Sequence, residues 1–461
     1  MTAASALLSQ VPDFQESPPP EVFGRAPREN NKLKLADRAA HQWYRFVLSY
    51  PPHLVRDYVA KFGLSTGHRV LDPFCGTGTT LVECKKLGIA SVGLEANPVV
   101  HFASQTKLKW NVDADALLAH AKLVAATAQE ILEAQGIDDS AALPLFGASG
   151  RPVAQLRGLT AEQEKLLLGN SISPLPLHKT FVLLDALAKH HDPRFADHER
   201  VALASALVSG ISNIHFGPEV GVGPAKVDAP VLCLWLNGIR AMADDLRHLA
   251  LCENTEAIVH QTDARDAAFV LAPNSVDAVI TSPPYPNEKD YTRTTRLESV
   301  LLGFIRSKEE LRALKKCLVR SNTRGVYKAD TDDALVADHP EIQRIAAAIE
   351  KRRIELEKTS GFEKLYARVT KLYFGGMARH LAELRTVLRP GAQLAYVVGD
   401  QASYLRVMIR TGELLADIAK SLGYEVTGID LFRTRLATAT REQLREEVVL
   451  LRWPGKNTRT A

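Results

Sequence analysis

This chain has few cysteines, no long apolar run and no large excess of charge, and each of these features excludes a class of protein. Only five cysteines occur, scattered along the sequence at Cys75, Cys84, Cys233, Cys252 and Cys317. Their spacing matches neither a zinc site nor a disulfide framework, which suits a reducing cytoplasm. No apolar run is long enough to cross a bilayer. We therefore expect a cytoplasmic protein with no resident metal and no membrane partner.

The charge of the chain is also nearly balanced. Its formal net charge is +4, so any surface for nucleic acid must come from local clusters of basic residues. Hydrophobic residues make up 46% and charged residues 24%, which is ordinary for a globular protein. Residues 1–31 are rich in proline, serine and acidic residues and lack a long apolar core. They predict a flexible tail, neither a signal peptide nor a membrane anchor.

The most informative segment is the pentapeptide Thr281-Ser282-Pro283-Pro284-Tyr285. The apolar run before it predicts a buried strand. Two prolines then end that strand and remove backbone donors. A serine hydroxyl, carbonyl acceptors and an aromatic face remain, and these are the groups that would hold a planar exocyclic amine. A strand followed by an ordinary proline-rich turn is the alternative interpretation.

A second motif, V-L-D-P-F-C-G-T-G-T-T, occupies residues 70–80. It predicts the end of a strand, a tight glycine turn and a helix that ends near Gly88. This order of elements brings the backbone close to a nucleotide-like ligand. A further predicted strand at 90–94 ends in Glu95, whose carboxylate is placed to accept both hydroxyls of a ribose. Taken alone, the motif is also compatible with a purely structural glycine turn.

Together the two motifs resemble the S-adenosylmethionine-dependent amino-methyltransferases of DNA. Residues 72–78 are similar to the methyl-donor loop of that family, and residues 282–285 to its catalytic tetrapeptide. The resemblance implies S-adenosylmethionine as cofactor and four catalytic residues, Ser282, Pro283, Pro284 and Tyr285. The implied cofactor-binding residues are Tyr44, Asp72, Pro73, Phe74, Gly76, Gly78, Thr79, Glu95, Asn97 and Asp263.

Three of these residues have a specific role in the resemblance. Glu95 matches the acid that binds the ribose, and Asp263 matches the acid that reads the adenine amine. Tyr44 lies in a segment, 41–62, that resembles the one covering the methionine end of the cofactor.

The predicted strands indicate a doubly wound, mostly parallel, Rossmann-like α/β sheet. Five strands, each followed by a helix, are expected near Val70, Val92, Ile258, Val279 and Val397. Two further runs, at 424–431 and 447–451, predict an antiparallel pair at one edge.

Large insertions divide this sheet in the sequence. We expect the catalytic domain at 32–110, 257–302 and 371–455. A helical insertion at 111–256 would act as a cap or target-recognition region. A second, basic insertion at 303–370 is a candidate for DNA contact.

The residues expected to contact DNA are basic and follow the tetrapeptide. Segment 320–328 mixes cations, hydroxyls, an amide and an aromatic ring, which suits phosphate contacts and readout of base edges. A solvated helix face is the alternative, because acidic residues dilute the positive charge. The candidates are Arg293, Arg296, Arg320, Arg324 and Lys328.

The resemblance implies methyl transfer to the exocyclic amine of a base flipped out of double-stranded DNA. Ser282 and the Pro283 carbonyl would accept the N–H bonds of the amine, and Tyr285 would stack on the base. No cysteine follows a proline in this chain, which argues against methylation of a cytosine ring carbon. Within the family, serine at the first tetrapeptide position favours the N4 amine of cytosine over the N6 amine of adenine.

Several alternatives stay open at this stage. They are adenine-N6 methylation of DNA, guanine-N2 methylation of RNA, methylation of a protein glutamine, and a donor-binding scaffold without catalysis. The leading interpretation is a nucleoid-associated cytoplasmic enzyme of a restriction-modification system. Its expected partner is double-stranded DNA, and a cognate restriction enzyme or another defence protein is a further candidate.

Overall fold

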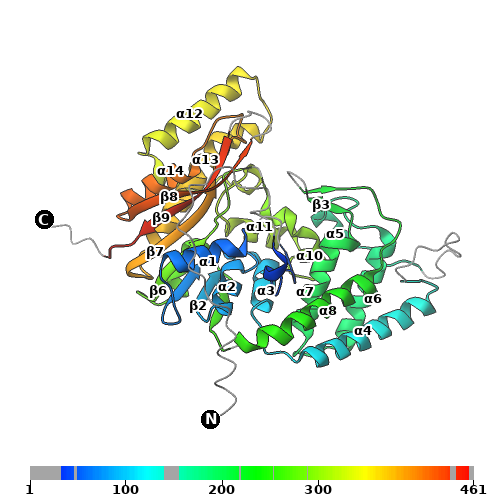
Figure 1. The fold of residues 1–461 in the computed structure, drawn as a ribbon. Helices are drawn as coiled ribbons and strands as arrows, with labels where there is room; N and C mark the ends of the chain where they lie inside the picture. Colours follow the sequence, from blue (N-terminus) through cyan, green and yellow to red (C-terminus); the bar gives the residue numbers. More distant parts are fainter. Residues whose placement is uncertain are drawn as a thin grey trace, which may run out of the picture.

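The computed structural model describes residues 33–45, 49–139, 155–216, 220–252, 254–287, 289–436 and 443–455. The predicted tail at 1–31 lies outside these ranges. A seven-stranded sheet forms the centre of one half of the molecule, and helices form the other half (Figure 1). None of the helices in the described ranges is long and apolar enough to span a membrane.

The strand order of the sheet is β5-β2-β1-β6-β7-β9-β8. In this order the strands are Ala257–His260, Ala90–Leu94, Arg69–Asp72, Val276–Thr281, Leu388–Gly399, Gln443–Arg452 and Glu425–Leu436. The first five run parallel, and β9 lies antiparallel between β7 and β8. This topology confirms the predicted doubly wound sheet and its antiparallel edge. The winding changes direction between β1 and β6, and sheets of this kind bind ligands at such a point.

Side chains of the central strands alternate between two apolar cores. Leu71 and Val279 point into the core beneath helices α13 and α14. Val70 and Ile280 point into the opposite core, beneath α1. Because neighbouring residues of a strand face opposite sides, a strand covered on both faces needs an uninterrupted apolar run. Helices α1, α2, α13 and α14 span Pro52–Lys61, Thr79–Lys86, Tyr366–Leu384 and Thr411–Ser421.

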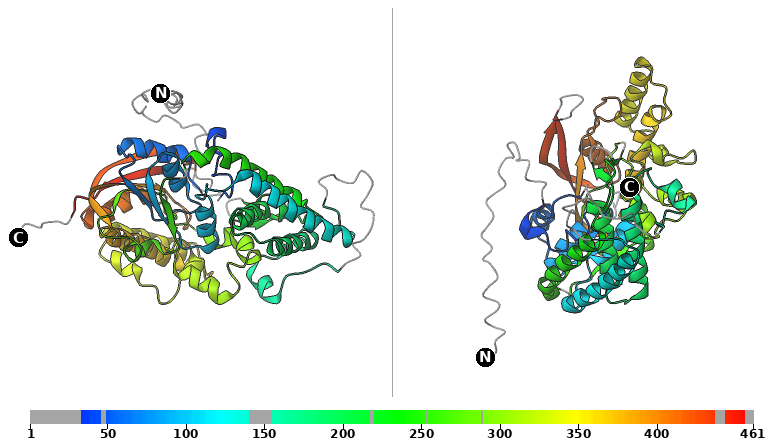
Figure 2. Two further views of the ribbon diagram at one scale, coloured as in Figure 1. Left: turned by 90° about the horizontal axis from the view of Figure 1, so that it is seen from below. Right: turned by 90° about the vertical axis from the view of Figure 1, so that its right-hand side faces the viewer.

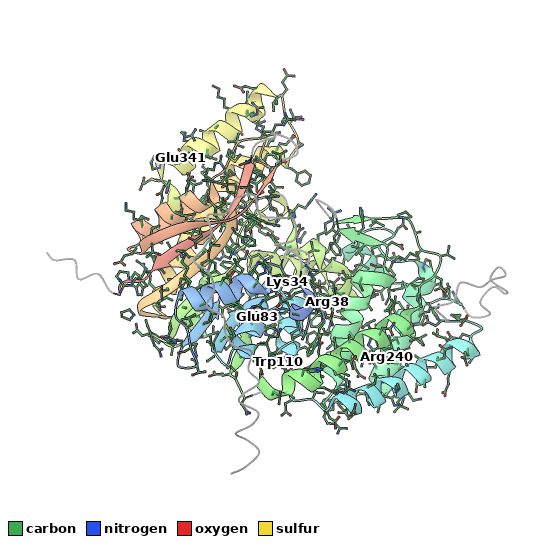
Figure 3. The ribbon with its side chains drawn as sticks, viewed as in Figure 1. Lys34, Arg38, Glu83, Trp110, Arg240 and Glu341 are labelled. Carbon is green, nitrogen blue, oxygen red and sulfur yellow. The ribbon has the colours of Figure 1, made fainter. Side chains whose placement is uncertain are left out.

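A bundle of helices lies beside the sheet, on the right in Figure 1 and in the left view of Figure 2. Its core is continuous with α2 through Leu81 and Val82. Trp110, labelled in Figure 3, is fully buried at the entry to the bundle, and its indole N–H donates to the Lys107 carbonyl at 2.7 Å. The main helices are α3 (Pro98–Thr106), α4 (Ala114–Ala134), α6 (Pro174–Lys189), α7 (Ala196–Ala206) and α8 (Val231–Leu249).

Helix α8 was not identified from the sequence, although its pattern is strongly amphipathic. Trp235, Ile239, Met242 and Leu246 recur at helical spacing and are all buried against the bundle core. This periodicity is the signal that would have found it. The bundle also carries a short helix, α5 (Ala161–Leu166), and a two-stranded hairpin, Ile214–Phe216 with Val220–Val222.

Between β6 and β7 the chain forms several short helices and two long ones, α12 and α13. Helix α12 stands out from the molecule at the top of Figure 1, next to α13. The helices that precede α13 here are α9 (Tyr291–Thr294), α10 (Arg296–Leu301), α11 (Lys308–Lys316) and α12 (Pro340–Glu355), with 3₁₀ turns at Thr323–Gly325, Asp332–Val336 and Glu363–Leu365.

Candidate active site

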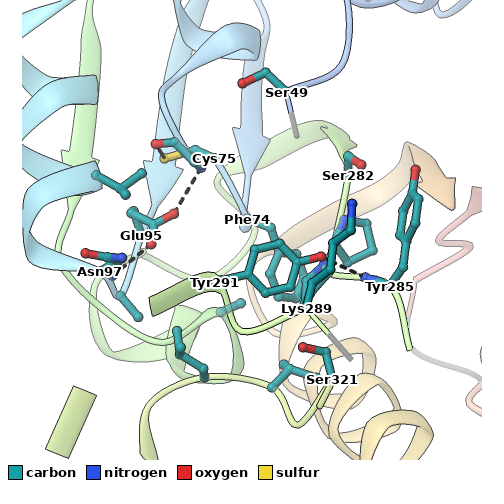
Figure 4. Close-up of a pocket in the computed structure, with 18 of the residues that line it drawn as sticks. Ser49, Phe74, Cys75, Glu95, Asn97, Ser282, Tyr285, Lys289, Tyr291 and Ser321 are labelled. Carbon is teal, nitrogen blue, oxygen red and sulfur yellow. Dashed lines mark hydrogen bonds between the residues drawn. The ribbon is translucent and has the colours of Figure 1, made fainter. Parts of the chain in front are cut away.

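A cavity of about 720 Å³ opens at the carboxyl ends of the central strands (Figure 4). Segments that follow β1, β2, β5 and β6 all contribute to its wall, together with the C-terminal hairpin β8–β9 and the segment after α11. The size is in the range of pockets that hold nucleotide-sized ligands. The two motifs found in the sequence therefore face one shared space.

The glycine turn after β1 presents its backbone to this cavity. Gly76 has φ +50°, and a Cβ placed on it would meet no atom within 4 Å, so the turn is open on the cavity side. Gly78 has φ +81° and lies against Ser104, where a Cβ would come within 3.2 Å of the serine Cβ. Both glycines adopt a left-handed conformation that other residues rarely take. Pro73, Phe74 and Thr79 also line the cavity.

Asp72 lies behind this turn and does not line the cavity. Its carboxylate accepts hydrogen bonds from Thr80 Oγ1 at 2.6 Å and Thr281 Oγ1 at 2.6 Å. Burial raises its pKa to about 6, although these bonds oppose the rise. Asp72 therefore connects the glycine turn after β1, called the donor turn below, to the end of β6. Its side chain does not face the cavity and is not placed to contact a cofactor there.

Glu95 lies at the tip of β2 and lines the cavity. One carboxylate oxygen accepts the backbone N–H of Gly76 at 3.0 Å, and the other accepts that of Asn97 at 2.8 Å. Burial raises its pKa to about 7 despite these two bonds. The geometry holds both oxygens at the edge of the open turn.

Two further polar side chains line the same part of the cavity. Asp263 follows β5 and forms a two-pronged ion pair with Arg265, whose Nη2 is 2.6 Å from Oδ2. The Asn97 side chain donates to Thr295 Oγ1 at 3.0 Å, while its buried Oδ1 has no partner among the described residues. Such an orphaned acceptor is costly unless a ligand supplies a donor.

The tetrapeptide begins where β6 ends. The Ser282 hydroxyl donates to the Val397 carbonyl on β7 at 3.2 Å. The backbone N–H of Tyr285 donates to Tyr291 Oη at 3.3 Å, which fixes the turn after the prolines (Figure 4). Ser282, Pro283, Pro284 and Tyr285 all line the cavity.

Tyr44 was expected beside the cofactor, and its position contradicts that expectation. It is buried away from the cavity, and its hydroxyl donates to the Glu298 carboxylate on α10. Tyr50 lines the cavity instead and points its hydroxyl at Asp72, 3.1 Å away. Both tyrosines lie in the segment singled out from the sequence, but only the tertiary structure shows which one faces inward.

Two of the predicted DNA contacts are also placed elsewhere. Arg320 lines the cavity wall but is buried in an ion pair with Asp330 at 2.8 Å. Arg296 donates to Thr292 Oγ1 at 2.7 Å and to the Leu166 carbonyl at 3.3 Å. Each guanidinium is thus committed to an internal contact, and neither is available to a phosphate.

The other three candidates lie outside the cavity wall. Arg293 is half-buried on α9, Arg324 stacks over Phe362 at 5.4 Å, and Lys328 is exposed. For these residues a role in binding DNA stays a prediction.

Several cavity residues were missed by the sequence analysis. The most notable are on the C-terminal hairpin, Arg433, Arg435 and Glu446, and just after the tetrapeptide, Asn287, Lys289 and Tyr291. No local pattern marks the hairpin residues, because only the sheet topology brings them to the cavity. Across the described ranges, no group of three or more acidic, histidine or cysteine side chains is arranged to hold a metal.

Comparison with known proteins agrees with this architecture. Residues 18–105 match the model of the N6/N4 DNA methylase family, which is described as DNA methylase. That match contains the donor turn and Glu95. The chain is therefore similar to the amino-methyltransferases of DNA, a family whose methyl donor is S-adenosylmethionine.

Individual relatives extend the similarity beyond this segment. The type II methyltransferase M.BsoBI of Geobacillus stearothermophilus is 26% identical over 445 residues, covering 90% of this chain and 84% of that protein. The type II methyltransferase M.AvaI of Nostoc sp. strain PCC 7120 is 24% identical over 451 residues, with coverages of 90% and 86%. A tRNA (guanine(10)-N2)-dimethyltransferase of Methanothermobacter thermautotrophicus is 45% identical over 47 residues, only 10% of this chain and 14% of that protein.

Proposed function

We propose that the protein methylates the N4 amine of a cytosine that is flipped out of double-stranded DNA, with S-adenosylmethionine as donor. The observation that carries the proposal is the Ser282 hydroxyl, which donates its proton to the Val397 carbonyl. Because that proton is already engaged, the oxygen is presented as an acceptor at the cavity wall. An exocyclic amine needs such an acceptor.

The donor side of the cavity fits the cofactor. The open face of Gly76 admits close approach of a ligand, and the Glu95 carboxylate can accept ribose hydroxyls. The orphaned Asn97 Oδ1 offers a further acceptor. S-Adenosylmethionine, when bound, supplies an electrophilic methyl group.

The tetrapeptide would prepare the target amine. The lone pair of such an amine is delocalised into the ring, which makes it a poor nucleophile. Acceptance of its N–H bonds by Ser282 and the Pro283 carbonyl would localise that pair on nitrogen. Tyr285 would hold the base by stacking, and correct orientation alone can supply about 7 kcal/mol or more. A base inside the duplex cannot reach this cavity, so flipping is required at a cost of a few kcal/mol.

The preference for cytosine rests on serine at the first position of the tetrapeptide, a feature that accompanies cytosine within the family. Adenine N6 is the second candidate because it presents the same kind of amine. The similarity to two type II methyltransferases supports a role in a restriction-modification system, with a restriction enzyme as partner.

The test is methyl transfer from radiolabelled S-adenosylmethionine to DNA from a host that lacks its own methyltransferases. Hydrolysis to nucleosides followed by mass spectrometry should identify N4-methylcytosine. N6-Methyladenine would overturn the choice of base and keep the reaction class. Transfer to tRNA or protein, with none to DNA, would overturn the proposed function.

A matched pair of serine variants tests the tetrapeptide. Ser282→Ala should lower the rate of methyl transfer and leave donor binding intact. Ser275→Ala is the control, because Ser275 lies just before the other end of β6 and its hydroxyl donates to the Ala272 carbonyl there. Full activity of Ser282→Ala would refute the acceptor role.

A further inference from the structure

We propose that Lys289 and Arg435 form a phosphate-binding pair at the mouth of the cavity, where they hold a phosphodiester of the DNA strand next to the flipped nucleotide. This inference rests on the proposed function and adds a binding site to it. Neither residue was identified as a DNA contact from the sequence.

The two residues reach the cavity from distant parts of the chain. Lys289 follows the tetrapeptide by four positions, while Arg435 lies near the end of β8 in the C-terminal hairpin. Both line the cavity that holds Ser282 and Tyr285. Figure 4 shows the Lys289 side chain beside Tyr285, on the side of the tetrapeptide. The pair is therefore created by the fold.

Other cations in the cavity wall are neutralised by carboxylates. Lys315 pairs with Asp290 at 2.9 Å, Arg320 pairs with Asp330 at 2.8 Å, and Arg433 contacts Glu446. Each of these side chains is thus committed to holding the wall together.

Lys289 and Arg435 differ from these cations. Among the residues that the structure describes, neither the Lys289 ammonium nor the Arg435 guanidinium has a hydrogen-bond or ion-pair partner. Burial lowers the pKa of Lys289, and the charge of Arg435 lowers it further, whereas Glu446 acts in the opposite direction. Since Glu446 is already bound to Arg433, it compensates only part of the positive charge of Lys289 and Arg435. An anion between the two cations would offset their repulsion.

The position favours a DNA phosphate over the carboxylate of the cofactor. Lys289 lies beside Tyr285, and Arg435 is close enough to Lys289 to lower its pKa. Gly76 and Glu95 instead contact each other on the donor side. A nucleotide that enters the cavity remains tied to its strand, so its flanking phosphates must pass the mouth. Phosphate contacts of this kind fix the register of a protein on DNA without reading sequence.

The test uses the full-length protein and a duplex that carries the sequence found modified in host DNA. Affinity is measured against salt concentration for Lys289→Gln, Arg435→Gln and the double variant. Each single substitution should lower the slope of log K against log salt by about 0.9, and the double variant by about twice that. Lys351→Gln is the control, because Lys351 is exposed on α12 and away from the cavity. Affinity for S-adenosylmethionine without DNA should stay unchanged in all four proteins.

A second duplex identifies the phosphate itself. Its phosphates on either side of the target base are replaced by uncharged methylphosphonates. This replacement should weaken binding to the wild type and have little further effect on the double variant. A free-phosphate site predicts instead that inorganic phosphate binds the wild type without DNA and that the methylphosphonates change nothing.

Three outcomes would overturn the pair. The first is a slope of log K against log salt that is unchanged in the double variant. The second is a loss of affinity for S-adenosylmethionine in either single variant. The third is that the methylphosphonates weaken DNA binding equally in the wild type and the double variant. If the wild type methylates DNA and the variants behave like it, only the phosphate pair fails. If the wild type neither binds nor methylates DNA, the proposed function fails as well.

Discussion

The ring of Tyr285 lies directly against Gly399, the last residue of β7. A Cβ placed on Gly399 would come within 2.9 Å of Tyr285 Cε2 and 3.3 Å of Cδ2. The φ angle of Gly399 is not in the left-handed region, so glycine serves here to leave space for the ring. The absence of a side chain at Gly399 therefore determines how closely the Tyr285 ring packs against the end of β7.

Gly399→Ala should displace the Tyr285 ring and misplace the target base. We expect methyl transfer to fall by about tenfold to a hundredfold, because a displacement of 1 Å can cost that much. Initial rates at saturating donor and DNA would measure the effect. Gly361→Ala is the control, since a Cβ there meets no atom within 4 Å. A Gly399→Ala enzyme as fast as the wild type would show that the contact does not position the ring.

Tyr285 is expected to act through its aromatic face. Tyr285→Phe keeps that face and should retain most of the activity. Tyr285→Ala removes it and should weaken DNA binding by about 1–3 kcal/mol, the usual value of one base stacked on an aromatic side chain. Equilibrium binding to the duplex compares the two variants directly. Equal losses in Tyr285→Phe and Tyr285→Ala would assign the role to the hydroxyl.

Donor binding should depend on pH through Glu95. Burial raises the pKa of this carboxyl to about 7, and ribose hydroxyls that donate to it would favour the ionised form. Binding of the donor then lowers the pKa of Glu95. Below pH 7, formation of the complex therefore releases the proton of the Glu95 carboxyl. Affinity should rise with pH by up to about tenfold per unit toward pH 7 and then level off. Calorimetric titration between pH 5.5 and about 8.5 would show this curve.

Glu95→Gln tests the assignment of that curve. The variant should bind the donor more weakly and lose most of the pH dependence. An unchanged curve in Glu95→Gln would place the titrating group elsewhere.

Tyr44 is expected to stabilise the fold without binding the donor. Its hydroxyl satisfies one oxygen of Glu298, while the other oxygen has no partner among the described residues. Tyr44→Phe should therefore cost about 1–3 kcal/mol of unfolding free energy, the usual penalty for an unsatisfied buried group. Denaturant unfolding measures this loss, and the donor affinity should be unchanged. Tyr50→Ala is the contrasting variant, because Tyr50 lines the cavity and should weaken donor binding.

The amino-acid sequence determined the sheet and its two main motifs. Short apolar runs, residues 70–71 before Asp72 and residues 278–280 before Thr281, specify strands that are buried on both faces, and the residues directly after them specify the turns. This information is local. Glu95 and Ser282 directly follow two strands of one parallel sheet, and the sequence therefore predicts that they lie at the same edge of it. The antiparallel pair at the C-terminus is predicted for the same reason.

Only the tertiary structure decided which side chains face the cavity. Tyr44 and Tyr50 look alike in sequence, yet packing against α10 buries one and leaves the other beside the donor turn. Arg320 appeared to be a free cation and is held by Asp330. Lys289 and Arg435 lie far apart in the chain, and both line the cavity because β8 pairs with β9 at the edge of the sheet. Local sequence fixes strands and turns, whereas the charges left unpaired at a site depend on contacts between distant segments.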